Sequence, residues 1–190
     1  MSSGSRRGNW AVTSQSLVNL ALVDLRQGRY EQAGDRMREA QAINGDTSNP
    51  VMTAGGLVCL GFIDLRQGRH EQAASRLRQA LKLSRDSGDP CGEAEALHGL
   101  GEVLLATGQA DRAIARYRAA LDMASAIGDK YEQARALCGL ADSHHAAGEP
   151  VRAHREWRQA LALFSVLGTP EADDIRDRLA RTRQDGPERT

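Results

Sequence analysis

Hydrophobic positions recur along this chain at helical spacing, and the whole pattern returns every forty residues. Leu17, Leu20 and Leu25 lie three to five residues apart, as on one face of an α-helix. Leucines occupy the same three positions forty and eighty residues later. A second apolar stretch in each period carries two alanines and a large residue between them. The pattern predicts helices near residues 10–27, 30–44, 50–67, 70–87, 90–107, 110–127, 130–147, 150–167 and 170–183.

The turns between these helices repeat as regularly as the helices do. Glycines stand at Gly28, Gly68, Gly108 and Gly148, and the segment Asp24 to Ala33 returns as Asp64 to Ala73 with one change in ten. Glycine ends a helix readily because it accepts a positive φ. A fixed period of this length indicates stacked supersecondary units that cannot bury their apolar faces alone. The sequence therefore predicts an all-α fold.

This periodicity also predicts the organisation of the chain. We expect a flexible N-terminus at 1–9 and a flexible tail at 184–190, since both ends are polar and rich in Gly, Ser, Arg or Pro. Between them the array spans 10–183, as four repeats and a capping helix. The expected units are 10–49, 50–89, 90–129, 130–169 and, for the cap, 170–183.

The repeated positions resemble those of the tetratricopeptide repeat over about residues 14 to 168. Each unit has Leu, then Leu followed by Gly or Ala, the turn glycine, and two alanines seven residues apart, such as Ala33 and Ala40. Two departures are that Leu17 and its equivalents stand where the family usually has Trp, and that the closing Pro is missing. The resemblance implies a right-handed α-solenoid of four helix–turn–helix repeats plus a C-terminal capping helix. It also implies a non-catalytic, protein-binding module.

A period of forty rather than thirty-four residues resembles a narrower set of arrays. Such arrays occur in actinobacterial regulators of the SARP and STAND types and in Leu-Gly-Asn repeat scaffolds. The closing stretch ALALFSVLGTPEADDIRDRLAR is similar to the end of regulator arrays. This resemblance leaves open an alternative function, a regulatory or sensor array of a bacterial transcription regulator. No DNA-binding or nucleotide-binding portion is visible in the sequence.

In this family the first helices of the repeats line a concave groove, and the family's groove positions can be transferred to this sequence. They fall on Val18, Leu22, Leu25, Arg26, Val58, Phe62, Leu65, Arg66, His98, Glu102, Leu105, Ala106, Cys138, Asp142, His145 and Ala146. The groove so defined is apolar with an arginine rim in its first half, and acidic with histidines in its second half. It would suit an amphipathic helix or an extended peptide. The alternative is that Val18, Leu22, Val58 and Phe62 are covered by the chain's own packing or by another part of a larger protein. A clamp for a C-terminal carboxylate would need Lys and Asn at these positions, which they lack.

Four of these groove residues have the side chains of a metal site. His98 and Glu102 share a helix face, as do Asp142 and His145, and the two pairs lie one period apart. Imidazoles and carboxylates are zinc ligands, but these spacings are common by chance. A solvated acidic patch is the simpler interpretation, and we expect no metal and no cofactor.

Composition and charge argue against several other classes of function. The chain has 25 basic and 25 acidic side chains and no net charge. An arginine ladder along the second helices, Arg38, Arg78, Arg118 and Arg158 with Arg36, Arg76 and Arg116, could touch phosphates. Acidic neighbours such as Glu31, Asp35 and Glu71 offset it, so a nucleic-acid partner is not expected. The sequence contains no phosphate loop, nucleophile elbow, HExxH or CxxC motif, so we expect no enzymatic activity.

The remaining expectations concern location and self-association. No stretch approaches the roughly 20 apolar residues of a membrane span. Three cysteines without a close pair, Cys59, Cys91 and Cys138, fit reduced thiols, and we expect a cytoplasmic protein. The first helix carries Trp10, Val12 and Leu17 with no polar cap before it. Terminal repeats need a polar outer face for solubility, so the sequence leaves open a homodimer that pairs through the N-terminal repeat.

Overall fold

The structure is a computed structural model that describes residues 12–14, 16–21, 23–24, 27–44 and 49–184. Helical residues occur at 12–14, 16–21 and 23–24. They are followed by α2 (Tyr30–Asn44), α3 (Pro50–Arg66), α4 (His70–Ser87), α5 (Pro90–Ala106), α6 (Ala110–Ala126), α7 (Lys130–Ala146), α8 (Pro150–Leu167) and α9 (Glu171–Gln184). From α2 onward, the helices predicted from the sequence agree with these bounds to within about one residue at each end.

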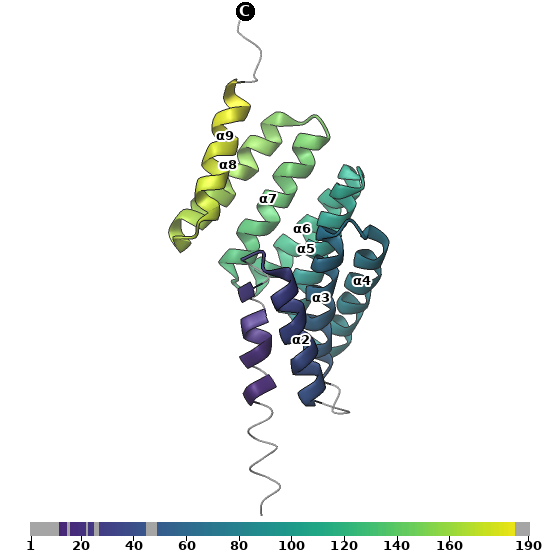
Figure 1. Ribbon diagram of the computed structural model, residues 1–190. Coiled ribbons are helices and arrows are strands. Elements are labelled where there is room, and N and C mark those ends of the chain that lie inside the picture. Colours follow the sequence, from purple (N-terminus) through teal and green to yellow (C-terminus); the bar gives the residue numbers. More distant parts are fainter. Residues whose placement is uncertain (1–11, 15, 22, 25–26, 45–48, 185–190) are drawn as a thin grey trace, which may run out of the picture.

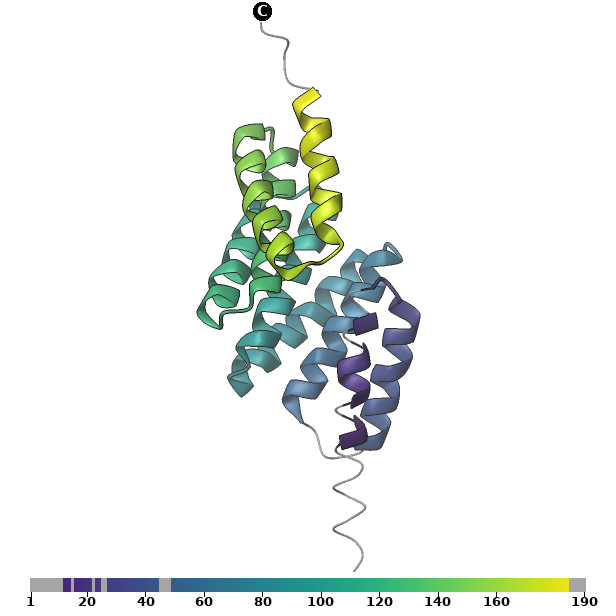
Figure 2. The same cartoon turned by 90° about the vertical axis from the view of Figure 1, so that its left-hand side faces the viewer.

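Successive helices pack as antiparallel pairs, and the pairs stack along one direction. Each helix from α2 to α9 contacts the next, and α5 also contacts both α3 and α7. Figures 1 and 2 show α2 near one end of the stack and α9 at the other. This is the all-α repeat array that the forty-residue period predicts.

The turns within the repeats end the first helices in the same way. Gly68 and Gly108 both have φ +73°. The residue after each glycine donates a backbone hydrogen bond to the first helix: Arg69 N to Asp64 O and Gln109 N to Leu104 O, both at 2.8 Å. This helix-ending pattern needs a left-handed residue, which glycine adopts without a steric cost.

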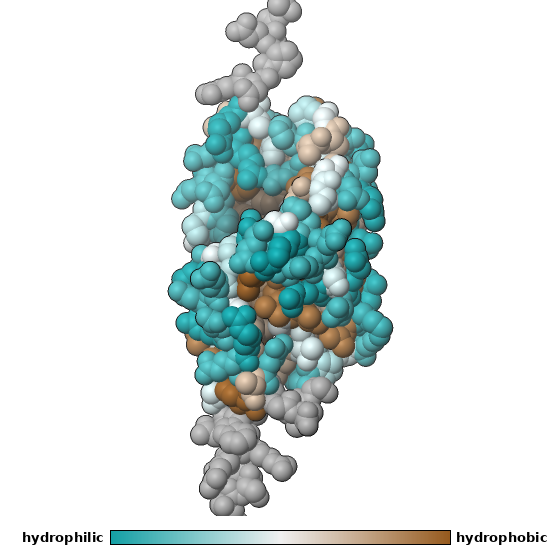
Figure 3. Space-filling model, turned by 45° about the vertical axis from the view of Figure 1, so that its right-hand side comes forward, coloured by the Kyte–Doolittle hydropathy of each residue, from teal (hydrophilic) through white to brown (hydrophobic). Residues whose placement is uncertain are grey.

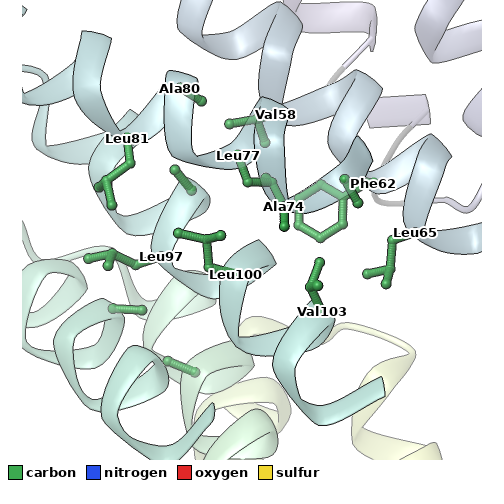
Figure 4. Close-up of a cluster of buried hydrophobic side chains, with 14 residues drawn as sticks. Val58, Phe62, Leu65, Ala74, Leu77, Ala80, Leu81, Leu97, Leu100 and Val103 are labelled. Carbon is green, nitrogen blue, oxygen red and sulfur yellow. The ribbon is translucent and has the colours of Figure 1, made fainter. Parts of the chain in front are cut away.

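The small residues that recur in the sequence are buried where helices approach closely. Ala73, Ala113 and Ala153 are fully buried, and the large residues near them, Tyr117 and Trp157, are only 1% and 2% exposed. Figure 4 shows one of the resulting clusters, in which Leu77 of α4 lies among side chains of α3 and α5. Repeated small and large positions therefore form a series of buried clusters along the array.

At the C-terminal end, α9 covers the last repeat. Ala172, Ile175 and Leu179 of α9 are buried in a cluster with Trp157 and Phe164 of α8. The outward positions of α9 are mostly charged. None of the described helices is long and apolar enough to cross a membrane.

Candidate binding cavity

The first helices of repeats two to four and α9 surround a cavity of about 630 Å³. We call it the inner cavity. Its lining residues come mainly from one side of the helix array and are Tyr30, Phe62, Leu65, Arg66, His70, His98, Glu102, Leu105, Ala106, Tyr117, Tyr131, Arg135, Cys138, Gly139, Asp142, Phe164, Glu171, Asp174, Ile175 and Arg178. Aromatic, apolar and charged side chains are thus combined in one hollow, as in many ligand sites.

Glu102 of α5 lies at the centre of the cavity's charge network. Its carboxylate contacts His98 Nε2 at 3.0 Å, Arg66 Nη2 at 3.6 Å and Arg135 Nη2 at 3.9 Å. Burial opposes ionisation of Glu102, but the hydrogen bond to His98 and the charges of His98, Arg135 and Arg66 outweigh it and lower its pKa from 4.5 to about 2. Glu102 is therefore a carboxylate at neutral pH.

Arg135 of α7 connects this network to the first helix of the following repeat. Its guanidinium donates to Glu132 Oε1 at 2.9 Å and stands 5.6 Å from the centroid of the Phe62 ring. Burial opposes its charge, yet Glu132 and Glu102 raise the pKa of Arg135 above its usual range. An arginine stacked on an aromatic ring and bound by carboxylates on two helices is held in place.

A second network lies at the C-terminal end of the cavity. Asp142 accepts a hydrogen bond from Trp157 Nε1 at 2.9 Å and is ion-paired with Arg178 of α9. Tyr131 donates its hydroxyl to Glu171 Oε1 at 2.7 Å. Burial and the charge of Asp142 raise the pKa of the Cys138 thiol to about 12, so this cysteine is not a reactive thiolate.

Most of the predicted groove residues that the structure describes do meet in this cavity. Phe62, Leu65, Arg66, His98, Glu102, Leu105, Ala106, Cys138 and Asp142 all line it. Phe62 is only 3% exposed, so it contributes the edge of a core side chain rather than an open surface. The first-helix positions of repeats two, three and four are thus brought together.

Other groove predictions need correction. Val58 is fully buried in the core beside Leu77, and Val18 is 8% exposed and packs with Met37. Both therefore belong to packing, which is the alternative that the sequence left open. His145 does not line the cavity, and its ring centroid lies 5.5 Å from that of Trp157. Leu22, Leu25 and Arg26 lie outside the described residues.

The sequence analysis missed cavity residues on α7 and α9. Tyr131 and Arg135 precede Cys138 and Asp142 on one helical face at steps of three and four residues, so extending that face toward the helix start would have found them. The α9 residues Glu171, Asp174, Ile175 and Arg178 follow the same spacing. They were overlooked because this helix was interpreted only as a cap.

The charge of the cavity also differs from the expected acidic half. Glu102 is matched by Arg66 and Arg135, and Asp142 by Arg178. The four residues with metal-ligating side chains are engaged elsewhere, with His98 contacting Glu102 and Asp142 paired with Arg178. Within the described part of the chain, no three His, Cys, Asp or Glu side chains are placed to share a metal ion.

The arginine ladder on the second helices has mixed roles. Arg36 and Arg76 form ion pairs with the buried Asp24 and Asp64, and Arg38 pairs with Asp35 at 2.6 Å. Several arginines of the ladder therefore form ion pairs within the chain, which leaves them less available to bind phosphates.

Comparison with known proteins identifies the family. A model described as "Tetratricopeptide repeat" matches residues 52–126 and 92–165, and a second model with this description matches 14–39. These matches cover more than half of the chain, which therefore belongs to the tetratricopeptide repeat family. Modules of this family generally serve protein–protein interaction and are typically non-catalytic scaffolds. No curated protein sequence matches the chain significantly.

Solved structures share the fold at low sequence identity. A Rap protein complexed with Competence and Sporulation Factor matches with TM-score 0.74 and 13% identity, over 92% of this chain and 53% of that chain. The apo form of RapI matches with TM-score 0.70 and 12% identity, over 90% of this chain and 63% of that chain. The TPR domain of Arabidopsis FLU matches with TM-score 0.58 and 22% identity, over 62% and 98% of the two chains. The chain thus spans between half and two thirds of the Rap chains.

Proposed function

We propose that the inner cavity binds a peptide segment of a protein partner without chemical change. The observation that supports this most is the cavity itself, about 630 Å³ in volume and lined along three successive first helices and α9. Its lining side chains come from α3, α5, α7 and α9, so the cavity extends past several repeats of the stack. A Rap protein of the same fold has been solved complexed with Competence and Sporulation Factor, which is consistent with the binding of a partner.

Two exposed charged residues that line the cavity, Arg66 on α3 and Asp174 on α9, define the peptide that fits best. Arg66 is 53% exposed and its contact with Glu102 is long, at 3.6 Å. Asp174 on α9 is exposed, and within the described residues it makes no ion pair or hydrogen bond. We therefore infer a segment that places an acidic side chain toward Arg66 and a basic one toward Asp174. Apolar side chains between them would contact Leu65, Leu105 and the cavity's aromatic rings.

A selection from a random peptide library displayed on phage tests this proposal. Peptides that bind the wild-type chain are synthesised, and their affinities are measured by fluorescence polarisation for the wild type, Arg66→Glu and Asp174→Arg. We expect each reversal to weaken binding about tenfold or more, as the loss of a charge-assisted contact would. These exposed positions are better choices than Phe62, whose replacement would disturb the core.

Arg158→Glu is the matched control, because Arg158 is exposed on α8 and does not line the cavity. It should leave the affinity unchanged. Failure to select any peptide, or equal binding to all four proteins, would refute the assignment of the cavity.

A second candidate function is the regulatory or sensor array suggested by the forty-residue period and the closing stretch from Ala160 to Arg181. In this function the peptide or protein in the cavity would control a transcription regulator. The test is co-expression with DNA-binding regulators encoded beside the gene, followed by size-exclusion chromatography. Co-elution with such a regulator would support the sensor function, and a neighbourhood without any regulator would contradict it.

Self-association through the N-terminal repeat is supported by the outer face of the first helical segment. Val12, Leu20 and Val23 are 66%, 49% and 44% exposed. A two-fold pairing of this face with itself would bury them.

A further inference from the structure

One position near the end of the first helix carries a buried polar side chain in three of the four repeats. In repeat two, Asp64 is 2% exposed and accepts hydrogen bonds from Arg69 Nε at 2.9 Å and Arg76 Nε at 2.7 Å. In repeat one, Asp24 is 1% exposed and is bound in the same way by Arg29 and Arg36. An unpaired buried carboxylate would be strongly destabilising, so the two arginines are part of the packing.

Repeat four has a similar arrangement, in which a histidine replaces the aspartate and two glutamates replace the two arginines. His144, which stands eighty residues after Asp64, is 1% exposed. Its Nδ1 lies 2.6 Å from Glu149 Oε2, and its Nε2 lies 3.5 Å from Glu156 Oε1. Glu149 and Glu156 occupy the positions of Arg69 and Arg76. In these repeats a polar side chain of the first helix is thus contacted by one side chain from the turn and one from the second helix.

Repeat three lacks the buried polar residue of the first helix and keeps only one of its two arginine partners. The three positions hold Leu104, Gln109 and Arg116. Arg116 makes no hydrogen bond or ion pair within the described part of the chain, because the carboxylate that would meet it is replaced by an apolar side chain. A pocket of about 270 Å³ lies at this place, and Leu104, Gln109 and Arg116 all line it.

The chemistry of this pocket is specific. Its apolar wall is formed by Ala74, Leu81, Leu100, Val103 and Leu104. Three arginines, Arg78, Arg112 and Arg116, stand around that wall, while Glu71 is the acidic residue among the lining side chains. Arg112 is hydrogen-bonded to Gln109, whereas Arg78, like Arg116, has no such partner among the described residues. The pocket is separate from the inner cavity, with which it shares His70. Figure 3 shows hydrophobic areas set among polar residues on one face of the molecule.

We propose that this pocket binds a carboxylate carried on a short apolar body, either a small organic acid or an acidic side chain of a partner. The carboxylate lies beside Arg116, whose aspartate partner is replaced by Leu104 in this repeat. The apolar part lies against Leu100 and Val103. A guanidinium favours a carboxylate because its planar donors match the two oxygens. A pocket of 270 Å³ is at the small end for ligand sites, which limits the ligand to one side chain or a molecule of similar size.

Binding of 3-phenylpropionate to the full chain, followed by two-dimensional NMR, tests the proposal. The uncharged analogue 3-phenylpropionamide has the same apolar body and serves as the ligand control. We expect the acid to shift the signals of α5 and α6 around the pocket, and the amide to bind about tenfold more weakly. The capped dipeptide acetyl-Phe-Glu-amide tests whether a side-chain carboxylate is also accepted. Its binding would indicate a protein partner, and binding of the free acid alone would indicate a small molecule.

Variants keep the test independent of folding. Arg116→Gln should weaken binding of 3-phenylpropionate about tenfold, whereas Arg118→Gln, an equal charge change on an exposed position of the same helix, should not. The double variant Leu104→Asp with Gln109→Arg rebuilds the group found in repeats one and two, and should abolish binding while circular dichroism stays helical. Equal binding of acid and amide, unchanged binding to Arg116→Gln, or no binding of either probe would overturn the proposal.

Discussion

At the scale of single residues, the close approach of helices depends on glycines that face one large side chain. A Cβ atom at Gly101 would lie 2.8 Å from Tyr117 Cε1, and one at Gly139 would lie closer still to the same ring. Tyr117 is 1% exposed and cannot move into solvent. At Gly55, by contrast, an added Cβ would lie 3.6 Å from Met37 Cε, an ordinary contact. The two kinds of helical glycine should therefore respond differently to alanine.

Gly139→Ala should lower the free energy of unfolding by about 1–3 kcal/mol, because the ring of Tyr117 must be displaced in a filled core. Gly55→Ala should raise it by about 0.5–1 kcal/mol, because alanine loses less conformational entropy in a helix. Urea denaturation followed by circular dichroism measures both. The account of the close approach fails if the two substitutions change stability in the same direction.

The ionisation of Glu102 should make the stability of the folded chain depend on pH. Its pKa is about 2 in the folded chain against an ordinary value of 4.5 for a glutamate, so the folded state favours the carboxylate. A lowered folded-state pKa contributes stability above the unfolded value, and this contribution is lost as pH falls from about 4.5 toward 2. At 1.36 kcal/mol per pKa unit, the full contribution is of the order of 3 kcal/mol.

Glu102→Gln should therefore show a shallower loss of stability between pH 5 and about pH 2.5 than the wild type. Chemical denaturation at a series of pH values gives both curves. Parallel curves would mean that the contacts with His98, Arg66 and Arg135 do not stabilise the charged form.

Some residue positions could be predicted from the sequence and others could not. Glycine and alanine positions recur because backbone geometry and close packing dictate them, and these were predictable. Val18 and Val58 were assigned to a groove from their family positions, but whether such a residue faces the cavity or the core depends on the rotation of its helix against its neighbours. A small rotation of the helix about its axis moves a side chain from the cavity to the core, and the forty-residue pattern does not determine this rotation.

At the scale of elements, α9 has two roles. Its inward face packs on α8 through Ile175 and Leu179, and Arg178 on the same helix reaches Asp142 of α7. The first role is that of the capping helix, which the family resemblance implies. The second role involves a contact between residues 36 positions apart, and nothing in the local pattern indicates it.

Ile175→Ala tests the packing of α9. Ile175 is 4% exposed, so its truncation should cost about 2–5 kcal/mol and lower the midpoint of thermal unfolding. Val166→Ala on the adjacent helix removes two methyl groups from a side chain that is 87% exposed, and should have almost no effect. Similar midpoints for both variants would show that α9 does not stabilise the array.

At the scale of the whole molecule, the two ends of the stack differ. The C-terminal end is closed by a helix with a charged outer face. The first helical segment presents Val12, Leu20 and Val23 outward. The sequence suggested this asymmetry from Trp10, Val12 and Leu17, although Trp10 lies outside the described residues and Leu17 is partly buried against the core.

If the exposed face pairs with a second copy, the wild-type chain should show a mass above that of the monomer that rises with concentration in light scattering. Leu20→Glu combined with Val23→Glu should then be monomeric with unchanged helicity, since both side chains point outward. A wild-type chain that remains monomeric at high concentration would exclude this pairing.

The central claim is that the inner cavity holds a peptide whose acidic side chain faces Arg66. The most direct measurement is a charge exchange between the chain and a peptide selected on the wild type. Each acidic residue of that peptide is replaced in turn by Lys, and binding to the wild type and to Arg66→Glu is measured by fluorescence polarisation. The account predicts that Arg66→Glu loses about tenfold in affinity for the original peptide and that one Lys peptide restores it. If Arg66→Glu binds the original peptide as well as the wild type does, and no Lys peptide prefers it, the claim is contradicted.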